Sequence, residues 1–127
     1  MVGKACLKKI KSLNTYDIIF QDSQKLDLRD YESVKNFFIE NKPDIIINAA
    51  ARVGGIHANS TYPFQFISEN LIMQYNLIKL AHDFNIKKFI FLGSSCIYPK
   101  FSKQPITENS LLTGSLEQTN EWYAIAK

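Results

Sequence analysis

The residues with the clearest chemical meaning in this sequence are a tyrosine and a lysine four positions apart, Tyr123 and Lys127. In a helix this spacing places a phenol and an ammonium on the same face, one turn apart. A free tyrosine has a pKa of about 10, too high for easy proton exchange at neutral pH, but a nearby cation favours the phenolate. Such a pair can act as the acid in ketone reduction or as the base in alcohol oxidation.

The Tyr-x-x-x-Lys spacing occurs three times in the chain, so the context of each copy must separate them. The copy at 31–35 precedes any strand that presents a partner hydroxyl, and the copy at 75–79 fits an ordinary solvated pair inside a long helix. Only Tyr123 follows a buried apolar run that ends in two hydroxyls, Ser94 and Ser95. A serine there can hydrogen-bond the same carbonyl oxygen that the tyrosine protonates. We therefore predict the catalytic centre at the third copy.

The composition bounds the class of protein. The chain has 127 residues, 46% of them hydrophobic and 21% charged, which suits one globular domain with a modest core. Its net charge of +3 comes from scattered lysines, so nucleic-acid binding is not predicted. There is no signal-peptide stretch and no membrane-length apolar run. Cys6 and Cys96 suggest no disulfide, no metal site is predicted, and a reduced cytoplasmic protein is expected.

Hydrophobic periodicity predicts helices alternating with strands. The inward-facing sets are predicted as Val2, Ala5, Cys6 and Ile10 in the first helix, Val34, Phe37, Phe38 and Ile39 in the second, and Phe66, Ile67, Leu71, Leu77, Ile78 and Ala81 in the third. The elements are helices at 2–13, from the Asp30 cap to about Asn41, from Pro63 to about Asn85 and from Tyr123, strands at 16–20, 43–50 and 88–93, and a surface loop at 95–120.

This alternation indicates an α/β fold with βαβ crossovers and a parallel sheet covered on both faces. We predict a partial Rossmann-type, doubly wound sheet over residues 1–127. In such sheets ligands bind at the carboxyl ends of the strands. The segments 48–51 and 93–98 both lie at those ends, so the chemistry is expected there.

Three segments also carry a family resemblance. Residues 48–59 read Asn-Ala-Ala-Ala-Arg-Val-Gly-Gly-Ile-His-Ala-Asn, residues 91–100 read Phe-Leu-Gly-Ser-Ser-Cys-Ile-Tyr-Pro-Lys, and residues 123–127 read Tyr-Ala-Ile-Ala-Lys. Together they resemble the GDP-L-fucose synthase family of extended short-chain dehydrogenases, over essentially the whole chain. The resemblance implies an NADPH-dependent enzyme that epimerises GDP-4-keto-6-deoxy-D-mannose at C3 and C5 and then reduces C4. It also implies homodimers for full-length members.

The resemblance assigns catalytic roles to four residues. Protons on C3 and C5 are acidified by the C4 ketone, and Cys96 would remove them as a thiolate. A free thiol has a pKa of about 8.5, so this role needs a positive or hydrogen-bonding setting. Ser94 and Tyr123 would hold the C4 oxygen, which Tyr123 finally protonates. Lys127 would lower the pKa of the tyrosine and bind the nicotinamide ribose.

The resemblance also places the cofactor. Gly3 matches the last glycine of the Gly-x-x-Gly-x-x-Gly loop that lets a pyrophosphate approach a helix N-terminus. Near the adenosine ribose, Asp22 could bind an unphosphorylated ribose, whereas Ser23 or Lys25 could bind the 2′-phosphate. The predicted cofactor is therefore NADP, and NAD stays an alternative. The predicted cofactor-binding set is Gly3, Ser23, Lys25, Asp27, Leu28, Ala49, Ala50, Ala51, Asn70, Leu92, Gly93, Ser94, Ser95 and Lys127.

Two parts of the family's fold do not match any segment of this chain: the first central strand and the substrate domain. Without that strand, the strands at 16–21 and 43–50 would lack a partner, at roughly 1–3 kcal/mol for each unsatisfied buried group. Whole-domain stability is only about 5–15 kcal/mol. We therefore expect that the 127 residues alone do not turn over substrate.

Two other interpretations stay open. The chain could belong to another extended nucleotide-sugar epimerase or dehydratase, against which Cys96 and the loop at 53–55 argue. It could also be an inactive remnant, or a binding module that uses a worn dinucleotide fold. Four intact residues argue against long decay: Ser94, Cys96, Tyr123 and Lys127.

Overall fold

The computed structural model describes all 127 residues, which form two compact units. Unit 1 consists of Met1–Ala50 and Met73–Leu92, and unit 2 consists of Ala51–Ile72 and Gly93–Lys127. The fold is α/β, as predicted. Along the chain the elements are α1 (Val2–Leu13), α2 (Tyr31–Asn41), β1 (Ile45–Asn48), α3 (Ile56–Thr61), α4 (Pro63–Asp83), β2 (Lys88–Phe91), two 3₁₀ turns, η1 (Ser95–Ile97) and η2 (Glu108–Ser110), and α5 (Glu121–Ile125).

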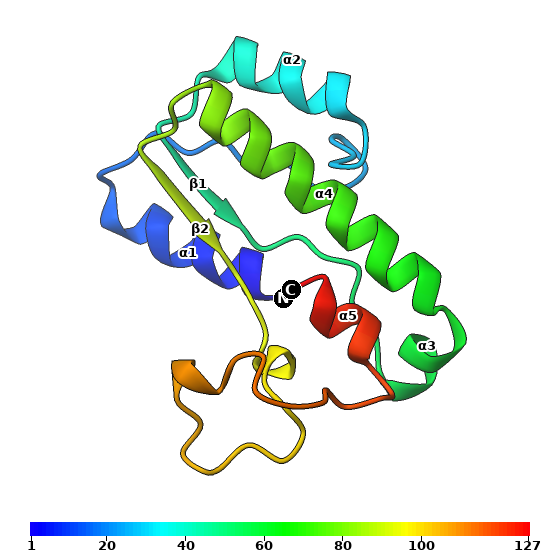
Figure 1. Cartoon of the computed structure of the whole chain (residues 1–127). Coiled ribbons are helices and arrows are strands. Elements are labelled where there is room, and N and C mark those ends of the chain that lie inside the picture. Colours follow the sequence, from blue (N-terminus) through cyan, green and yellow to red (C-terminus); the bar gives the residue numbers. More distant parts are fainter. The chain divides into compact units, whose positions relative to one another are not determined.

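The sheet of unit 1 consists of two parallel strands. β1 pairs with β2 in a register that runs from Ile45 opposite Lys88 to Asn48 opposite Phe91. The ribbon has α1 on one side of this pair and α2 and α4 on the other (Figure 1). The predictions of parallel strands at 43–50 and 88–93 are confirmed, with shorter bounds. β1 has no strand on its second edge.

The predicted strand at 16–20 is wrong. These residues form no ladder, and no backbone hydrogen bond joins them to another segment. An isolated extended segment has no regular partner for its N–H and C=O groups, so apolar β-branched composition alone cannot make it a strand. Ile19 and Phe20 remain 45% and 47% exposed as a result.

The core of unit 1 lies between α2 and α4. Val34 and Phe38 of α2 pack with Leu77 and Leu80 of α4, and all four side chains are buried. Asp30 caps α2 as predicted, because its carboxylate accepts hydrogen bonds from the backbone N–H groups of Glu32 and Ser33. No helix in the structure, including the 21-residue α4, is long and apolar enough to cross a membrane.

Several residues predicted to face inward are exposed instead. α4 carries apolar residues around most of its circumference, so periodicity could not choose the buried face, and Leu71 and Ile78 lie outside. α1 has no buried side chain, so the face of β1 on that side is covered only in part. The exposed members of the predicted sets are Val2, Ala5, Ile39, Leu71 and Ile78, and those of the predicted buried strand include Ile45 and Ile47.

Unit 2 contains structure that the sequence pattern did not predict. The segment between β1 and Pro63, for which no element was predicted, includes the short helix α3, which begins after Gly55. The predicted surface loop at 95–120 contains η1 and η2. An ion pair of 2.6 Å between Lys100 and Glu117 closes this loop on itself.

Candidate functional site

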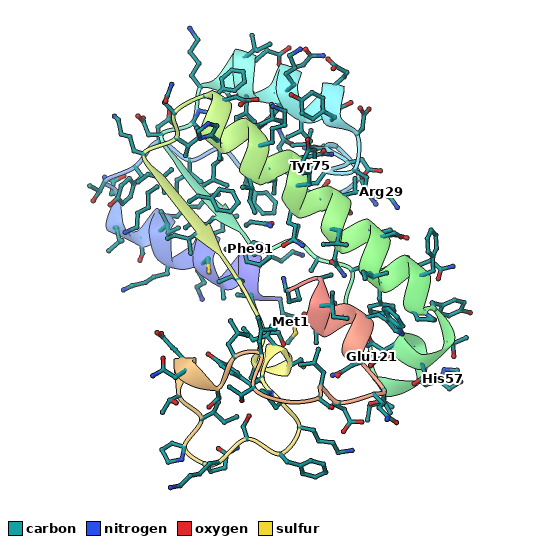
Figure 2. The ribbon with its side chains drawn as sticks, in the orientation of Figure 1. Met1, Arg29, His57, Tyr75, Phe91 and Glu121 are labelled. Carbon is teal, nitrogen blue, oxygen red and sulfur yellow. The ribbon has the colours of Figure 1, made fainter.

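The candidate site lies in unit 2, where η1 packs against α5. Ser94 is the N-cap of η1, and its hydroxyl oxygen accepts the backbone N–H of Cys96 at 3.3 Å. α5 begins at Glu121 (Figure 2) and carries Tyr123 in its first turn. The polar strand-end segment and the tyrosine helix therefore meet in space although 29 residues separate Ser94 from Tyr123 in the numbering.

Ser94, Cys96 and Tyr123 interact with one another. Burial raises the pKa of Tyr123, and the charge of Cys96 raises it further. The side chain of Ser94 acts in the opposite direction and lowers the pKa of Tyr123. The phenol is thus close enough for both Ser94 and Cys96 to influence its protonation. This is the convergence on which the predicted catalytic roles depend.

Lys127 is placed differently from expectation. α5 ends at Ile125, so Lys127 follows the helix and does not complete a regular turn with Tyr123. Its Nζ lies 6.0 Å from the centroid of the tyrosine ring. Burial lowers the pKa of Lys127, and the groups that set the pKa of Tyr123 are burial, Cys96 and Ser94. The roles predicted for Lys127, toward the Tyr123 phenol and the nicotinamide ribose, stay predictions.

A phenylalanine from α4 supports the tyrosine. The rings of Phe66 and Tyr123 meet edge to face, with centroids 6.3 Å apart and planes at 80°. Phe66 is only 2% exposed, and the guanidinium carbon of Arg52 lies 5.4 Å from its centroid. A Cβ at Gly54 would meet Cζ of Phe66 at 2.9 Å and Cβ of Ala58 at 3.0 Å. The glycine therefore leaves the space that the supporting ring occupies.

We predict that Gly54→Ala destabilises unit 2 and disturbs Tyr123 through Phe66. Forcing a methyl into this space costs roughly 1–3 kcal/mol, because the ring must move. The matched control is Gly55→Ala, where a new Cβ has no atom within 4 Å and the expected loss is below about 1 kcal/mol. Urea denaturation measures both variants, and Tyr123 ring resonances report the displacement. Equal stabilities for the two variants would contradict the prediction.

Asn70, which was predicted to contact the cofactor, is hydrogen-bonded within the protein. It is 4% exposed, and its amide oxygen accepts the backbone N–H of Arg52 at 2.8 Å. Its Nδ2 donates to the carbonyl oxygens of Arg52 at 3.1 Å and Phe66 at 2.7 Å. Both amide hydrogens are thus used within the protein. Asn70 holds the loop that follows β1, and the side chain of Arg52 adds a 2.8 Å ion pair with Glu69.

The predicted ribose-phosphate segment forms an exposed turn in unit 1. Asp22 Oδ1 accepts the backbone N–H groups of Gln24 at 3.1 Å and Lys25 at 3.3 Å, an Asx-type turn. Ser23 and Lys25 are exposed. One carboxylate oxygen of Asp22 therefore stabilises the turn itself. The hydroxyl of Ser23 and the ammonium of Lys25 form no hydrogen bond within the protein.

The predicted adenine segment is held by two neighbours. Arg29, in the loop before α2 (Figure 2), donates from Nε and Nη2 to the carboxylate of Asp27 at 2.9 Å and 2.7 Å. These bonds lower the pKa of Asp27 to about 2. The buried amide of Asn76 donates to the carbonyl oxygen of Leu28 at 2.9 Å. Asp27 is thus committed to Arg29, and Leu28 packs against the core of unit 1.

Most of the other residues predicted to bind the cofactor follow β1 and β2. Gly3 lies in α1 beside Ala49, where a Cβ on Gly3 would make an ordinary contact of 3.4 Å with Cβ of Ala49. Asn48 accepts the backbone N–H of Ala50 at 3.0 Å through its side chain and that of Leu92 at 3.3 Å through its carbonyl. In unit 2, Ala51 is half-buried, whereas Gly93 and Ser95 are exposed.

The prediction from sequence missed Asn120. Its Nδ2 donates to Sγ of Cys96 at 3.2 Å, and its backbone forms the N-cap of α5. An asparagine directly before a helix signals a cap. Asn120 lies at the end of the polar segment 95–120, where several other residues could also cap a helix. The sequence contains no pattern that predicts its contact with the sulfur of Cys96.

Comparison with known proteins decides the family. The NAD dependent epimerase/dehydratase family matches residues 1–127 in full. The chain belongs to this family. Among its curated relatives, GDP-L-fucose synthase 1 of Arabidopsis thaliana is 52% identical over 127 residues, which cover all of this chain and 39% of the relative. The chain thus spans about two-fifths of that relative's length.

Solved structures of related enzymes share the fold. GDP-mannoheptose C4 reductase of Campylobacter jejuni with NADP bound superposes with a TM-score of 0.93 at 33% identity, over 98% of this chain and 37% of that one. A GDP-L-fucose synthetase of Naegleria fowleri bound to NADP gives a TM-score of 0.88 at 34% identity, over 98% of this chain and 40% of that one. The epimerase/dehydratase chain therefore has a Rossmann-type fold, as predicted.

Proposed function

We propose that this chain supplies the catalytic centre of a GDP-L-fucose synthase, an enzyme that epimerises GDP-4-keto-6-deoxy-D-mannose at C3 and C5 and reduces C4 with NADPH. The observation that carries the proposal is the convergence of Ser94, Cys96 and Tyr123 in unit 2. The 52% identity to an enzyme of that name, over the whole chain, supports the choice of substrate.

The interaction between Cys96 and Tyr123 divides the acid and base roles. A thiolate at Cys96 raises the pKa of Tyr123, so the phenol keeps its proton when the sulfur has lost one. A phenol that keeps its proton suits the role of acid, and we assign the role of base to the neighbouring Cys96. Cys96 takes the proton from the carbon beside the ketone, the C–H electrons move into an enolate, and Ser94 and Tyr123 donate hydrogen bonds to its oxygen. A proton returned to the opposite face of that carbon completes the epimerisation and restores the ketone. Tyr123 then gives its proton to the C4 oxygen as C4 is reduced.

The cofactor that suits this chain is NADP. The exposed Ser23 and Lys25 offer a hydroxyl and an ammonium to a 2′-phosphate, whereas Asp22 uses one carboxylate oxygen within its own turn. Because Gly3 has no side chain, its backbone can approach a pyrophosphate. When bound, the reduced cofactor supplies the hydride for C4. Lys127 would bind its ribose.

We place the full-length enzyme in the cytoplasm as a homodimer. The outer face of α4 is apolar and exposed, with Tyr75 63% and Ile78 50% exposed, beside Leu71 and Ile72. A helix face of this kind is buried in proteins by another helix or a partner subunit. Light scattering measures the mass of a hybrid in which residues 1–127 replace the matching segment of the Arabidopsis thaliana relative. A monomeric mass would contradict the proposed dimer.

A hybrid enzyme tests the proposed function. In it, residues 1–127 replace the matching segment of the Arabidopsis thaliana relative, which supplies the remaining three-fifths of its length. We expect the hybrid to oxidise NADPH with GDP-4-keto-6-deoxy-D-mannose within about tenfold of the relative's rate, because a tenfold loss corresponds to only about 1.4 kcal/mol. The chain by itself is expected not to turn over.

The outcomes separate the alternatives. A folded hybrid that is inactive with this substrate but active with another nucleotide sugar would favour a different epimerase or dehydratase. A folded hybrid inactive with all of them would favour the inactive remnant or binding module. Turnover by the isolated 127 residues would refute the expectation that the rest of the enzyme is required.

A further inference from the structure

Asn120 carries an unusual combination of bonds for a helix cap. It precedes α5, where an asparagine oxygen normally accepts a backbone N–H of the first turn, but this side chain makes no such bond. Its Oδ1 is buried without a hydrogen-bond partner. Its Nδ2 donates to Sγ of Cys96 at 3.2 Å. The side chain of Asn120 therefore makes no capping bond, and its amide oxygen has no hydrogen-bond partner. A buried polar atom without a partner needs an explanation.

The backbone fixes this side chain in place. The N–H of Asn120 donates to the carbonyl oxygen of Glu117 at 3.1 Å, and its own carbonyl oxygen accepts the N–H of Ala124 at 3.0 Å. Glu117 is in turn held by its 2.6 Å ion pair with Lys100. The amide is therefore presented to the sulfur by a loop closed on itself and by the first turn of α5.

The chemistry of this contact favours the ionised sulfur. A thiol is a weak hydrogen-bond acceptor, whereas a thiolate is a charged one, and bonds to charged groups are about twice as strong. A donor that binds the charged form more strongly shifts the equilibrium toward it. α5 brings Glu121 and Tyr123 to η1, and Lys127 follows the helix. Of these, Tyr123 is the group whose pKa responds to Cys96, because a negative charge on the sulfur disfavours the phenolate.

We propose that Asn120 is a positioning residue that holds Cys96 as the thiolate and sets the sulfur beside the tyrosine helix. The amide Nδ2–H stabilises the charge on Sγ, while the backbone of the same residue starts the helix that carries Tyr123. One residue thereby couples the base to the acid of the site. The identity of the substrate from which the thiolate removes a proton rests on the proposed function. The effect of Asn120 on the reactivity of the Cys96 thiol does not depend on it.

Alkylation of the full chain tests the proposal without any substrate. Iodoacetamide reacts with thiolate, forming an S–C bond as iodide leaves, so its rate follows the thiolate fraction. Mass spectrometry of peptides measures Cys96 and Cys6 separately between pH 5 and 10 in the same sample. The variants are Asn120→Asp, an isostere that cannot donate, and Asn120→Ser, which keeps a favoured capping residue but falls short of the sulfur. Asn109→Asp, exposed in η2, is the matched control.

We expect both Asn120 variants to alkylate Cys96 roughly tenfold more slowly at pH 7, the equivalent of about 1.4 kcal/mol. Their curves of rate against pH should move to higher pH, while Cys6 and the Asn109→Asp control stay unchanged. Circular dichroism measures whether each variant is folded. If Asn120→Asp is unfolded, the result for Asn120→Ser tests the proposal. An unchanged curve, or faster reaction at Cys96, would overturn the proposal. Slower alkylation together with an inactive hybrid would leave this inference standing and refute the proposed function.

Discussion

Cys96→Ser in the hybrid enzyme is expected to stop the exchange of solvent deuterium into C3 and C5 of the keto sugar. A serine hydroxyl is far less acidic than a thiol, so it cannot take the place of the thiolate at neutral pH. Loss of a positioned base costs about 10²- to 10⁴-fold in rate. Mass spectrometry of the sugar after incubation in D₂O with NADP⁺, which separates exchange from reduction, measures the effect.

The control for this substitution is the second thiol of the chain. Cys6→Ser makes the same chemical change in α1, and deuterium exchange is expected to proceed at the unchanged rate. NADPH oxidation by Cys96→Ser should persist at a reduced rate, since hydride transfer to C4 removes no carbon-bound proton. Exchange at the rate of the unsubstituted hybrid would remove Cys96 from the role of base.

Tyr123→Phe is expected to lower NADPH oxidation by about 10²- to 10⁴-fold, the usual contribution of a positioned acid. Burial and the charge of Cys96 raise the pKa of Tyr123 above its ordinary value of about 10. The phenol therefore holds its proton throughout the neutral range and loses it only as the pH rises through that raised pKa. Phenylalanine removes this proton but keeps the ring that packs against Phe66.

Because the ring is kept, the fold of Tyr123→Phe should survive, and steady-state kinetics then report chemistry alone. Tyr31→Phe is the matched control, since Tyr31 belongs to another Tyr-x-x-x-Lys pair that lies in unit 1. It is expected to leave turnover within about twofold, in line with a small change in stability. A Tyr123→Phe enzyme with the activity of this control would show that another group protonates the C4 oxygen.

The meeting of Ser94 with Tyr123 could be predicted from sequence because it follows from topology. A buried strand that ends in hydroxyls places them at the carboxyl edge of a parallel sheet, wherever the side chains later point. The contact of Asn120 with Cys96 could not be predicted, because it depends on how a polar loop of irregular backbone folds.

Element types were predicted better than buried faces. The cap at Asp30 is a local interaction between neighbours, so the sequence contains all that determines it. The segment at 16–20 fails for the opposite reason, because a strand exists only through its partner. Leu71 and Ile78 were assigned to the core from periodicity, but α4 is apolar on more than one face, and tertiary packing selected another.

The unpaired edge of β1 makes the behaviour of this chain depend on its concentration. A free edge is a template of N–H and C=O groups onto which any extended peptide can add, and Ile45 and Ile47 supply an apolar surface beside it. Two copies in dilute solution rarely meet, whereas crowded copies can stack edge to edge and precipitate. Handling at low concentration thus preserves the individual molecule, and a charged substitution at Ile47 would work to the same end.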